Sequence, residues 1–272
     1  MAALDLYRKE VEANGDPCGQ YDVGRMYEIG LGVEKSDEAA AKWFRRAAEQ
    51  GDSSAQFKLG WAYEEGWGVE QSGEEAVKWY KLAAEQGDLD SQLSLGSLYE
   101  QGDVVEQSGE EAVKWYRKAA EQGDYLAQAA LGHIYGYGVG VEKDLKEAKK
   151  WYEILASKGD CNAVANLGCL AYMEGSEQSY EEARRLFEKA SDMGSSLSKV
   201  FLASMCIDGL AGEASKEEAL ELLSDVSDDE DEDVQRVIAL VKIGDWNGCS
   251  LEIKKLIFSP VEYVPPELLP PN

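Results

Sequence analysis

The sequence predicts an all-α solenoid, a stack of helix pairs, and three repeating features support this. Tryptophans recur every 36 residues, at Trp43, Trp79, Trp115 and Trp151. A Val-Gly or Leu-Gly pair recurs at the same interval, at 23–24, 59–60, 95–96, 131–132 and 167–168. Segments 69–88 and 105–124 differ at only two positions. Repetition at this period is typical of stacked supersecondary units that share one continuous core.

The first half of each unit is predicted to be a helix that starts after a Gly-Asp pair, as at 51–52, 87–88, 123–124 and 159–160. Glycine suits the left-handed residue that ends the preceding helix, and aspartate caps the next one. Small and apolar residues then follow at helical spacing, as Ala55, Leu59, Gly60 and Tyr63 do in one unit. A glycine-rich turn such as GWGV at 66–69 closes this half.

The second half of each unit is predicted to be a helix that starts at a capping box, in which two residues three apart satisfy each other's backbone amides. The pairs with this spacing are Ser72 and Glu75, Ser108 and Glu111, Asp144 and Glu147, Ser179 and Glu182, and Ser215 and Glu218. The helix continues with Ala76, Trp79, Tyr80 and Ala83, which form a face suited to packing against its neighbours. We interpret the tryptophans as core residues.

The repeats are expected to fill residues 1–258, with a capping helix over 3–14 and units that start near 15, 51, 87, 123, 159, 194 and 230. Terminal units should depart from the pattern, because one of their faces meets water. The seventh unit has a first helix from Val234 and a poor second helix near 249–258. The tail 259–272 holds five of the six prolines, so it is not helical. We favour a tail that packs as a strap over the apolar edge of the last repeat. The alternatives are a free end and a ligand for another domain.

Units of about 36 residues with AxxxLGxxY, then GxGV, then EAxxWYxxAAxxG resemble the Sel-one-like repeats (SLR), relatives of the tetratricopeptide repeats. The resemblance implies a right-handed superhelix of about seven antiparallel helix pairs, with the first helices on the concave side. It also implies an adaptor that brings proteins together. Secreted members with paired cysteines differ from this chain, which keeps alanine at Ala48, Ala84, Ala120 and Ala156. The penicillin-binding behaviour of that subgroup is therefore not expected here.

Composition narrows the range of partners and compartments. The net charge of −26 disfavours phosphate backbones and anionic lipid, so we expect neither nucleic acid nor membrane insertion, and a protein or peptide partner with basic character. Solubility alone also explains the charge. The N-terminal stretch lacks the features of a signal peptide. The five cysteines, Cys18, Cys161, Cys169, Cys206 and Cys249, form no metal-binding pattern, so we predict reduced thiols in a cytoplasmic protein.

Motifs for catalysis, cofactors or metals are not found in the sequence. The one histidine, His133, offers little for a nucleophile–base pair and is interpreted as a surface residue, with groove contact as the alternative. The glycine-rich GYGVGVEK at 136–143 lacks the lysine-hydroxyl end of a phosphate loop. The acidic run 225–233 is interpreted as a solvated loop. Its alternatives are a docking site for a basic segment, or an acidophilic kinase site at Ser227.

Two functional classes remain, and the unbroken period favours the first. This is a non-catalytic scaffold that binds a peptide or protein in the concave groove. The second is an enzyme or enzyme-regulating subunit, for example one related to the cell envelope, with its site on a loop between repeats. First-helix positions opposite the Leu-Gly-Tyr face define the predicted groove, although drift at unconstrained surface sites also produces such variety. The predicted partner-binding residues are Arg25, Lys58, Trp61, Glu65, Ser97, Gln101, His133, Tyr137 and Asn166. We expect Trp61 and Tyr137 to be the anchors, with Arg25 and Lys58 setting the register on a carboxylate-bearing segment.

Overall fold

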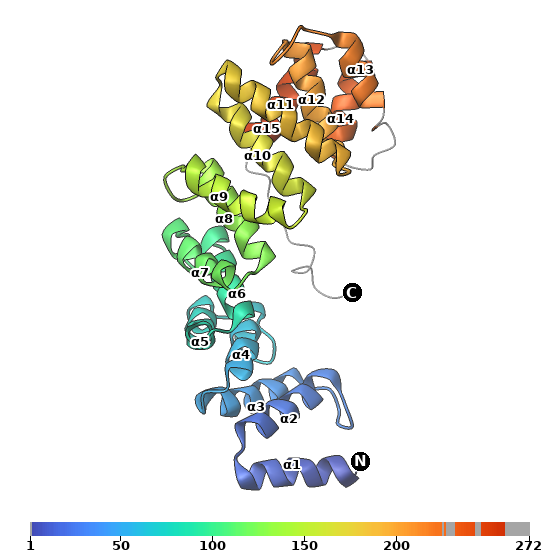
Figure 1. Cartoon of the computed structure of the whole chain (residues 1–272). Coiled ribbons are helices and arrows are strands. Elements are labelled where there is room, and N and C mark those ends of the chain that lie inside the picture. The colour runs from blue at the N-terminus through green and yellow to red at the C-terminus, as the bar shows by residue number, and fades with distance from the viewer. Residues whose placement is uncertain (1, 225, 227–231, 243–245, 259–272) are drawn as a thin grey trace. The chain divides into compact units, whose positions relative to one another are not determined.

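All regular secondary structure in the described residues, 2–224, 226, 232–242 and 246–258 of a computed structural model, is helical (Figure 1). The all-α class and the pairing of neighbouring helices are therefore confirmed. The chain divides into two compact units, residues 1–124 (unit 1) and 125–272 (unit 2). The predicted proline-rich tail and most of the acidic run 225–233 lie outside the described residues.

Unit 1 contains a lone first helix followed by three helix pairs. Its helices are α1 (Ala2–Asn14), α2 (Pro17–Ile29), α3 (Asp37–Glu49), α4 (Ser53–Glu65), α5 (Gly73–Glu85), α6 (Leu89–Gln101) and α7 (Gly109–Glu121). Unit 2 continues the alternation. Its helices are α8 (Tyr125–Tyr137), α9 (Leu145–Ser157), α10 (Cys161–Glu174), α11 (Glu177–Asp192), α12 (Ser196–Asp208), α13 (Lys216–Ser224), α14 (Glu232–Lys242) and α15 (Trp246–Phe258).

The helix starts follow the predicted caps, with two corrections. Asp52 and Ser72 accept hydrogen bonds from the amides of Ala55 and Glu75, which is the N-cap contact. The second half of the predicted capping box is replaced, because the Glu75 carboxylate accepts from Lys78 and Trp79 instead. The cap predicted at Ser179 is wrong. Helix α11 begins earlier, and Ser176 is its N-cap with Ser179 as the reciprocal partner.

Each of the five pairs from α2/α3 to α10/α11 has a glycine in its first helix that packs on an aromatic ring of the second helix. A Cβ added at Gly60 would lie 2.7 Å from the ring of Tyr80, and one at Gly96 would lie 2.5 Å from the ring of Tyr116. Glycine inside a helix is unfavourable by about 1 kcal/mol relative to alanine. The close approach of the two helices explains why it is kept there.

Successive pairs in unit 1 are joined by tryptophans and by a ladder of buried glutamines. Trp79 of α5 is buried against Ala47 and Ala48 of the preceding pair and Leu59 of its own pair, as predicted for a core residue. Gln56 donates to the carbonyl of Ala48 at 3.1 Å and accepts from Gln86 at 2.7 Å. Gln92 makes the same two contacts in the next pair, and this ladder was not predicted from the sequence. A buried amide with both ends satisfied fixes the register between pairs.

The four cysteines whose side chains are described, Cys18, Cys161, Cys169 and Cys206, are free thiols. Cys161 and Cys169 share helix α10, as predicted. Burial raises the pKa of the Cys169 thiol to about 12 and that of the Cys206 thiol to about 11. These two thiols therefore stay protonated and poorly reactive at neutral pH.

We expect reductant to leave the melting temperature unchanged, because no cross-link constrains the unfolded chain. Thermal unfolding followed by circular dichroism, with and without dithiothreitol, checks this. In the native state, a thiol reagent should label exposed Cys18 and spare Cys169. A lower melting temperature in reductant, or an intact mass two units low, would contradict the prediction.

Candidate functional site

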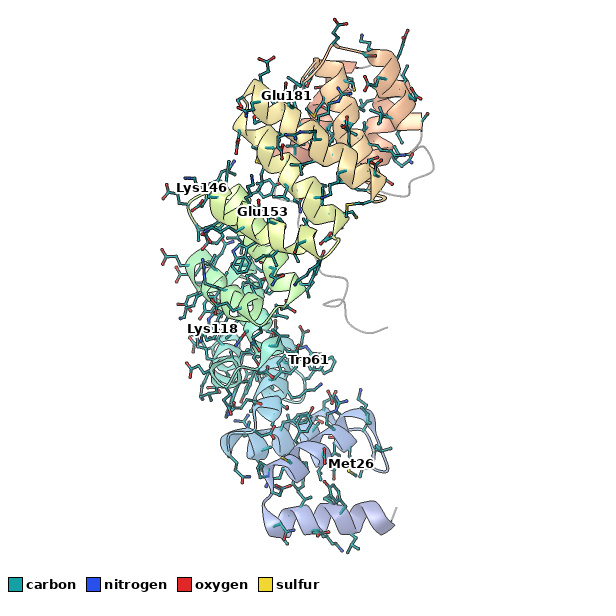
Figure 2. The ribbon with its side chains drawn as sticks, viewed as in Figure 1. Met26, Trp61, Lys118, Lys146, Glu153 and Glu181 are labelled. Atoms are coloured by element: carbon teal, nitrogen blue, oxygen red, sulfur yellow. The ribbon has the colours of Figure 1, made fainter. Side chains whose placement is uncertain are left out.

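The predicted groove residues of unit 1 lie on the first helices and are half-buried or exposed, so they remain accessible beside the core. Arg25 lies on α2, Lys58 and Trp61 lie in the middle of α4, and Glu65 ends α4. Arg25, Lys58 and Trp61 are half-buried, whereas Glu65 is exposed. Figure 2 shows Trp61 projecting from α4 on the side away from α5.

One carboxylate links two of the predicted cations. Glu28 accepts from Nη1 of Arg25 at 2.6 Å and from Nζ of Lys58 at 3.0 Å. The Lys58 ammonium also lies 5.0 Å from the ring centroid of Trp61, within the range of a cation–π interaction. The two cations are therefore fixed by partners within unit 1, and their excess charge beside Glu28 is about +1.

A second tryptophan completes this surface. The ring of Trp67, in the turn after α4, lies 4.2 Å from the ring of Trp61 at an angle of 56°. Trp67 is 42% exposed, which is unusual for the largest apolar side chain. A pocket beside the two rings is lined by Ala40, Ala41 and Phe44 of α3. We call Lys58, Trp61, Trp67 and this pocket the tryptophan patch.

Two partly buried carboxylates lie near the C-terminal ends of the first helices α4 and α6. Glu64 of α4 accepts from the hydroxyl of Tyr80 at 2.5 Å, and Glu100 of α6 accepts from that of Tyr116 at 2.8 Å. Burial raises the pKa of both carboxyl groups, and the tyrosine hydroxyls oppose this by donating to the ionised form. Each of these carboxyl groups is therefore poorly solvated and ionises less readily than an exposed one, and a basic group nearby would favour its ionised form.

Replacing Tyr80 with phenylalanine is expected to raise the pKa of Glu64 further, because the carboxylate loses its hydrogen-bond donor. Carbon-13 titration of the side-chain carboxyls measures this, and Glu100, which keeps Tyr116, is the internal control. Because the pKa in the folded state is raised, folding is favoured most where the carboxyl is protonated. That contribution is lost as pH rises through the folded-state value. A variant with the wild-type Glu64 midpoint would contradict the assignment.

The sequence analysis missed Glu28, Glu64 and Glu100, although a signal was present. They recur every 36 residues, as the tryptophans do. The pattern was overlooked because acidic residues are abundant in this chain. Trp67 was also missed, because it was assigned to the turn and not to the helix.

The predicted groove residues of α6 differ in their surroundings. Ser97 is half-buried and forms a side-chain hydrogen bond with Tyr116. Gln101 is the last residue of α6 and is exposed. This part of the first-helix surface is polar, in contrast to the tryptophan patch.

The predicted groove residues of unit 2 are half-buried, which corrects the prediction of a surface position for His133. The His133 ring lies 4.9 Å from the ring of Tyr137, its Nε2 is buried without a hydrogen-bond partner, and burial lowers its pKa. Tyr137 donates from its hydroxyl to the carbonyl of Ile257 in α15 at 3.2 Å. Asn166 lies on α10. A helix from the end of the chain thus covers part of this predicted face.

Within the described residues, no group of three or more histidine, cysteine, aspartate or glutamate side chains is arranged to hold a metal ion. In the same part of the chain, no helix is long and apolar enough to cross a membrane.

Comparison with known proteins identifies the repeats. The Sel1 repeat model matches residues 19–52, 53–88, 89–124, 126–160 and 162–195. A Sel1 repeat protein from Oxalobacter formigenes is 34% identical, with a TM-score of 0.61, and the alignment covers 80% of this chain and 90% of that one. No curated protein matches the chain.

The protein c5321, a protective antigen of uropathogenic Escherichia coli strains with an SLR fold, is 28% identical, also with a TM-score of 0.61. The alignment covers 95% of this chain but only 60% of c5321, so the chain spans less than two thirds of that protein. Five matched repeats, which together cover more than half of the residues, show that the chain belongs to the Sel1 repeat family.

Proposed function

We propose that this protein is a non-catalytic scaffold that binds a peptide or protein segment across the first helices of unit 1, with the tryptophan patch as its anchor. Sel1 repeat proteins are typically protein-interaction scaffolds, and their solenoid fold is typically non-catalytic. The observation that carries the proposal is the exposed Trp67 ring, which packs at a tilt against Trp61 beside the α3 pocket. Exposed rigid aromatics at a pocket are the residues that dominate binding hot spots.

The surroundings of the patch favour a partner segment with both apolar and basic side chains. The pocket beside Ala40, Ala41 and Phe44 measures about 20 Å³, which admits a group no larger than a methyl, and the face of an indole attracts a cation. Glu64 and Glu100, which are poorly solvated, gain most from a lysine or arginine. Arg25 and Lys58 are already paired with Glu28, so they contribute less to binding a carboxylate than the sequence predicted. The net charge of −26 would steer a basic partner to the protein.

We place the protein in the cytoplasm, because its described cysteines are free and two of them are buried thiols. Cys18 is exposed and Cys161 is half-buried, so an oxidising compartment would leave these two thiols open to cross-linking.

The experiment compares two single variants of the full chain in affinity capture from the source cells, with quantitative mass spectrometry. Trp67→Ala removes the exposed ring of the patch. Leu82→Ala is the matched control, because Leu82 is 41% exposed but lies on the second helix α5. We expect Trp67→Ala to lose the specific partners and Leu82→Ala to keep them. The captured partners should also elute with salt, since basic contacts are screened.

If Trp67→Ala keeps every partner that the wild-type chain binds, the tryptophan patch is not the site. Circular dichroism of both variants verifies that they remain folded. A partner that is lost from both variants would indicate general destabilisation, which the melting temperatures would reveal.

A further inference from the structure

Helix α15 departs from the order of the repeats. A second helix such as α11 packs against the first helix of its own pair, α10, and against the next first helix, α12. Helix α15 instead packs on α12 and α14, also contacts α10, and reaches Tyr137 of α8. Figure 1 shows α15, in red, alongside α10 and α12. It therefore lies across first helices of three successive pairs, as a bound ligand would.

The apolar face of α15 is inserted into this surface. Ile253 and Ile257, four residues apart and so on one side of the helix, are both 0% exposed. They belong to one core cluster with Cys169 and Tyr172 of α10 and Val200 of α12. Cys169 occupies the repeat position that is Arg25, Trp61 and Ser97 in unit 1, so the first-helix position that α15 covers is the one predicted to line the groove.

Two polar contacts of α15 meet at one carboxylate of α12, while Glu252 of α15 pairs separately with Arg236 of α14 at 3.1 Å. Lys254 pairs with Asp208 at 2.7 Å, and Ser250 donates to the same carboxylate at 2.9 Å. Asp208 is the last residue of α12, where the helix dipole disfavours a negative charge. The cation and the hydroxyl offset this. The hydroxyl of Tyr137 satisfies the carbonyl of Ile257, one of the terminal carbonyls that α15 cannot pair internally.

We propose that the first-helix surface of α8, α10 and α12 is a groove for an amphipathic helix, and that α15 is its built-in, displaceable occupant. A helix that fits the groove has two isoleucines four residues apart, as Ile253 and Ile257 are in α15. It also has a lysine directly after the first isoleucine and a serine three residues before that isoleucine, as at Lys254 and Ser250. An external helix with this pattern binds only when α15 leaves. The proposal depends on contacts within unit 2 and is independent of the tryptophan patch.

The first test is hydrogen exchange of the full wild-type chain. A displaceable α15 opens by itself, so its amides over 248–258 should exchange about tenfold or more faster than those of α12, as a separate local unit. Lys254→Glu should accelerate α15 further and leave α11 unchanged. Lys255→Glu is the control, because Lys255 pairs with Glu252 of its own helix and not with Asp208. Equal protection of α15 and α12 would show that α15 is an integral part of the core and would overturn the proposal.

The second test uses a fluorescent peptide of residues 246–258 and the full chain with Ile253→Asp and Ile257→Asp, which loosens α15. The peptide should bind the loosened chain in fluorescence anisotropy and show at least about tenfold weaker binding to the wild-type chain, whose groove is occupied. A peptide with the same two aspartates should bind neither. The proposal is overturned if the peptide fails to bind the loosened chain or binds both chains equally. The proposal is also overturned if the chain with both substitutions loses more helical residues than α15 contains, because the loss would then extend beyond α15.

Discussion

Replacing Trp115 with alanine is expected to lower the free energy of unfolding by roughly 3–5 kcal/mol, the range for large aromatic truncations in a core. Trp115 is 2% exposed and belongs to the same core cluster as Ala84 of the preceding pair and Leu95 of its own pair. Its Nε1 donates to the Glu111 carboxylate at 3.2 Å, so the substitution also removes a hydrogen bond. Urea unfolding followed by far-UV circular dichroism measures the change.

The chain offers a matched control at Trp67. This tryptophan is 42% exposed, so its replacement removes the same side chain with far less burial, and we expect a loss of less than about 1 kcal/mol. Similar losses for the two variants would show that burial between the pairs does not determine the energetic role of these tryptophans.

The fold could be predicted because local and periodic signals agreed. Asp52 and Ser72 cap helices where the sequence placed them, and Trp79 and Trp115 are buried where the period required it. The start of α11 was misplaced because two serines three residues apart, Ser176 and Ser179, both suit an N-cap. Only the backbone geometry decides between them.

The arrangement of the last helix could not be predicted. The 36-residue count assigns 249–258 to a second helix of a seventh pair, and nothing local indicates otherwise. Helix α15 packs where folding brings Asp208 next to an apolar surface of α10 and α12. These residues are far from α15 in the sequence, so their contact with it cannot be read from the repeat pattern. Long-range contacts of this kind leave no periodic signal.

The candidate site was predictable in part for the same reason. Helical spacing placed Lys58 and Trp61 on one accessible stripe. It gave no sign that Trp67, from a turn, contacts Trp61, or that Glu28 pairs with both predicted cations. Which side chains from separate elements meet is decided by the tertiary structure. The sequence therefore cannot distinguish charged residues that are free in an open groove from charged residues that are already paired.

A close contact between the start of α5 and the loop after α6 leads to the last prediction. A Cβ at Gly73 would lie 2.0 Å from the carbonyl oxygen of Val104, closer than such atoms approach. In the preceding pair the roles are exchanged. There Gly68 lies in the loop, and a Cβ on it would lie 2.1 Å from the carbonyl oxygen of Asp37. Each contact therefore has one glycine, in the helix or in the loop.

Gly73→Ala is expected to destabilise the protein although it raises helix propensity. The propensity favours alanine by about 1 kcal/mol, but overpacking against a backbone carbonyl typically costs about 1–3 kcal/mol. Steric overlap with a backbone atom is relieved only if the loop moves, so we expect the second effect to exceed the first. Val104→Gly also destabilises the protein, because Val104 packs against the core cluster.

The double variant decides whether this contact is the cause. A glycine at 104 has more freedom of φ and ψ and no side chain to hold the loop in place, so Gly73→Ala should be less harmful in the Val104→Gly background. We expect the two losses to be non-additive by about 1 kcal/mol, as is typical of residues in direct contact. Urea unfolding of the wild-type chain, the two single variants and the double variant completes the cycle. Losses that simply add would show that the loop already accommodates a Cβ at position 73, and that the alternation of glycines does not reflect packing.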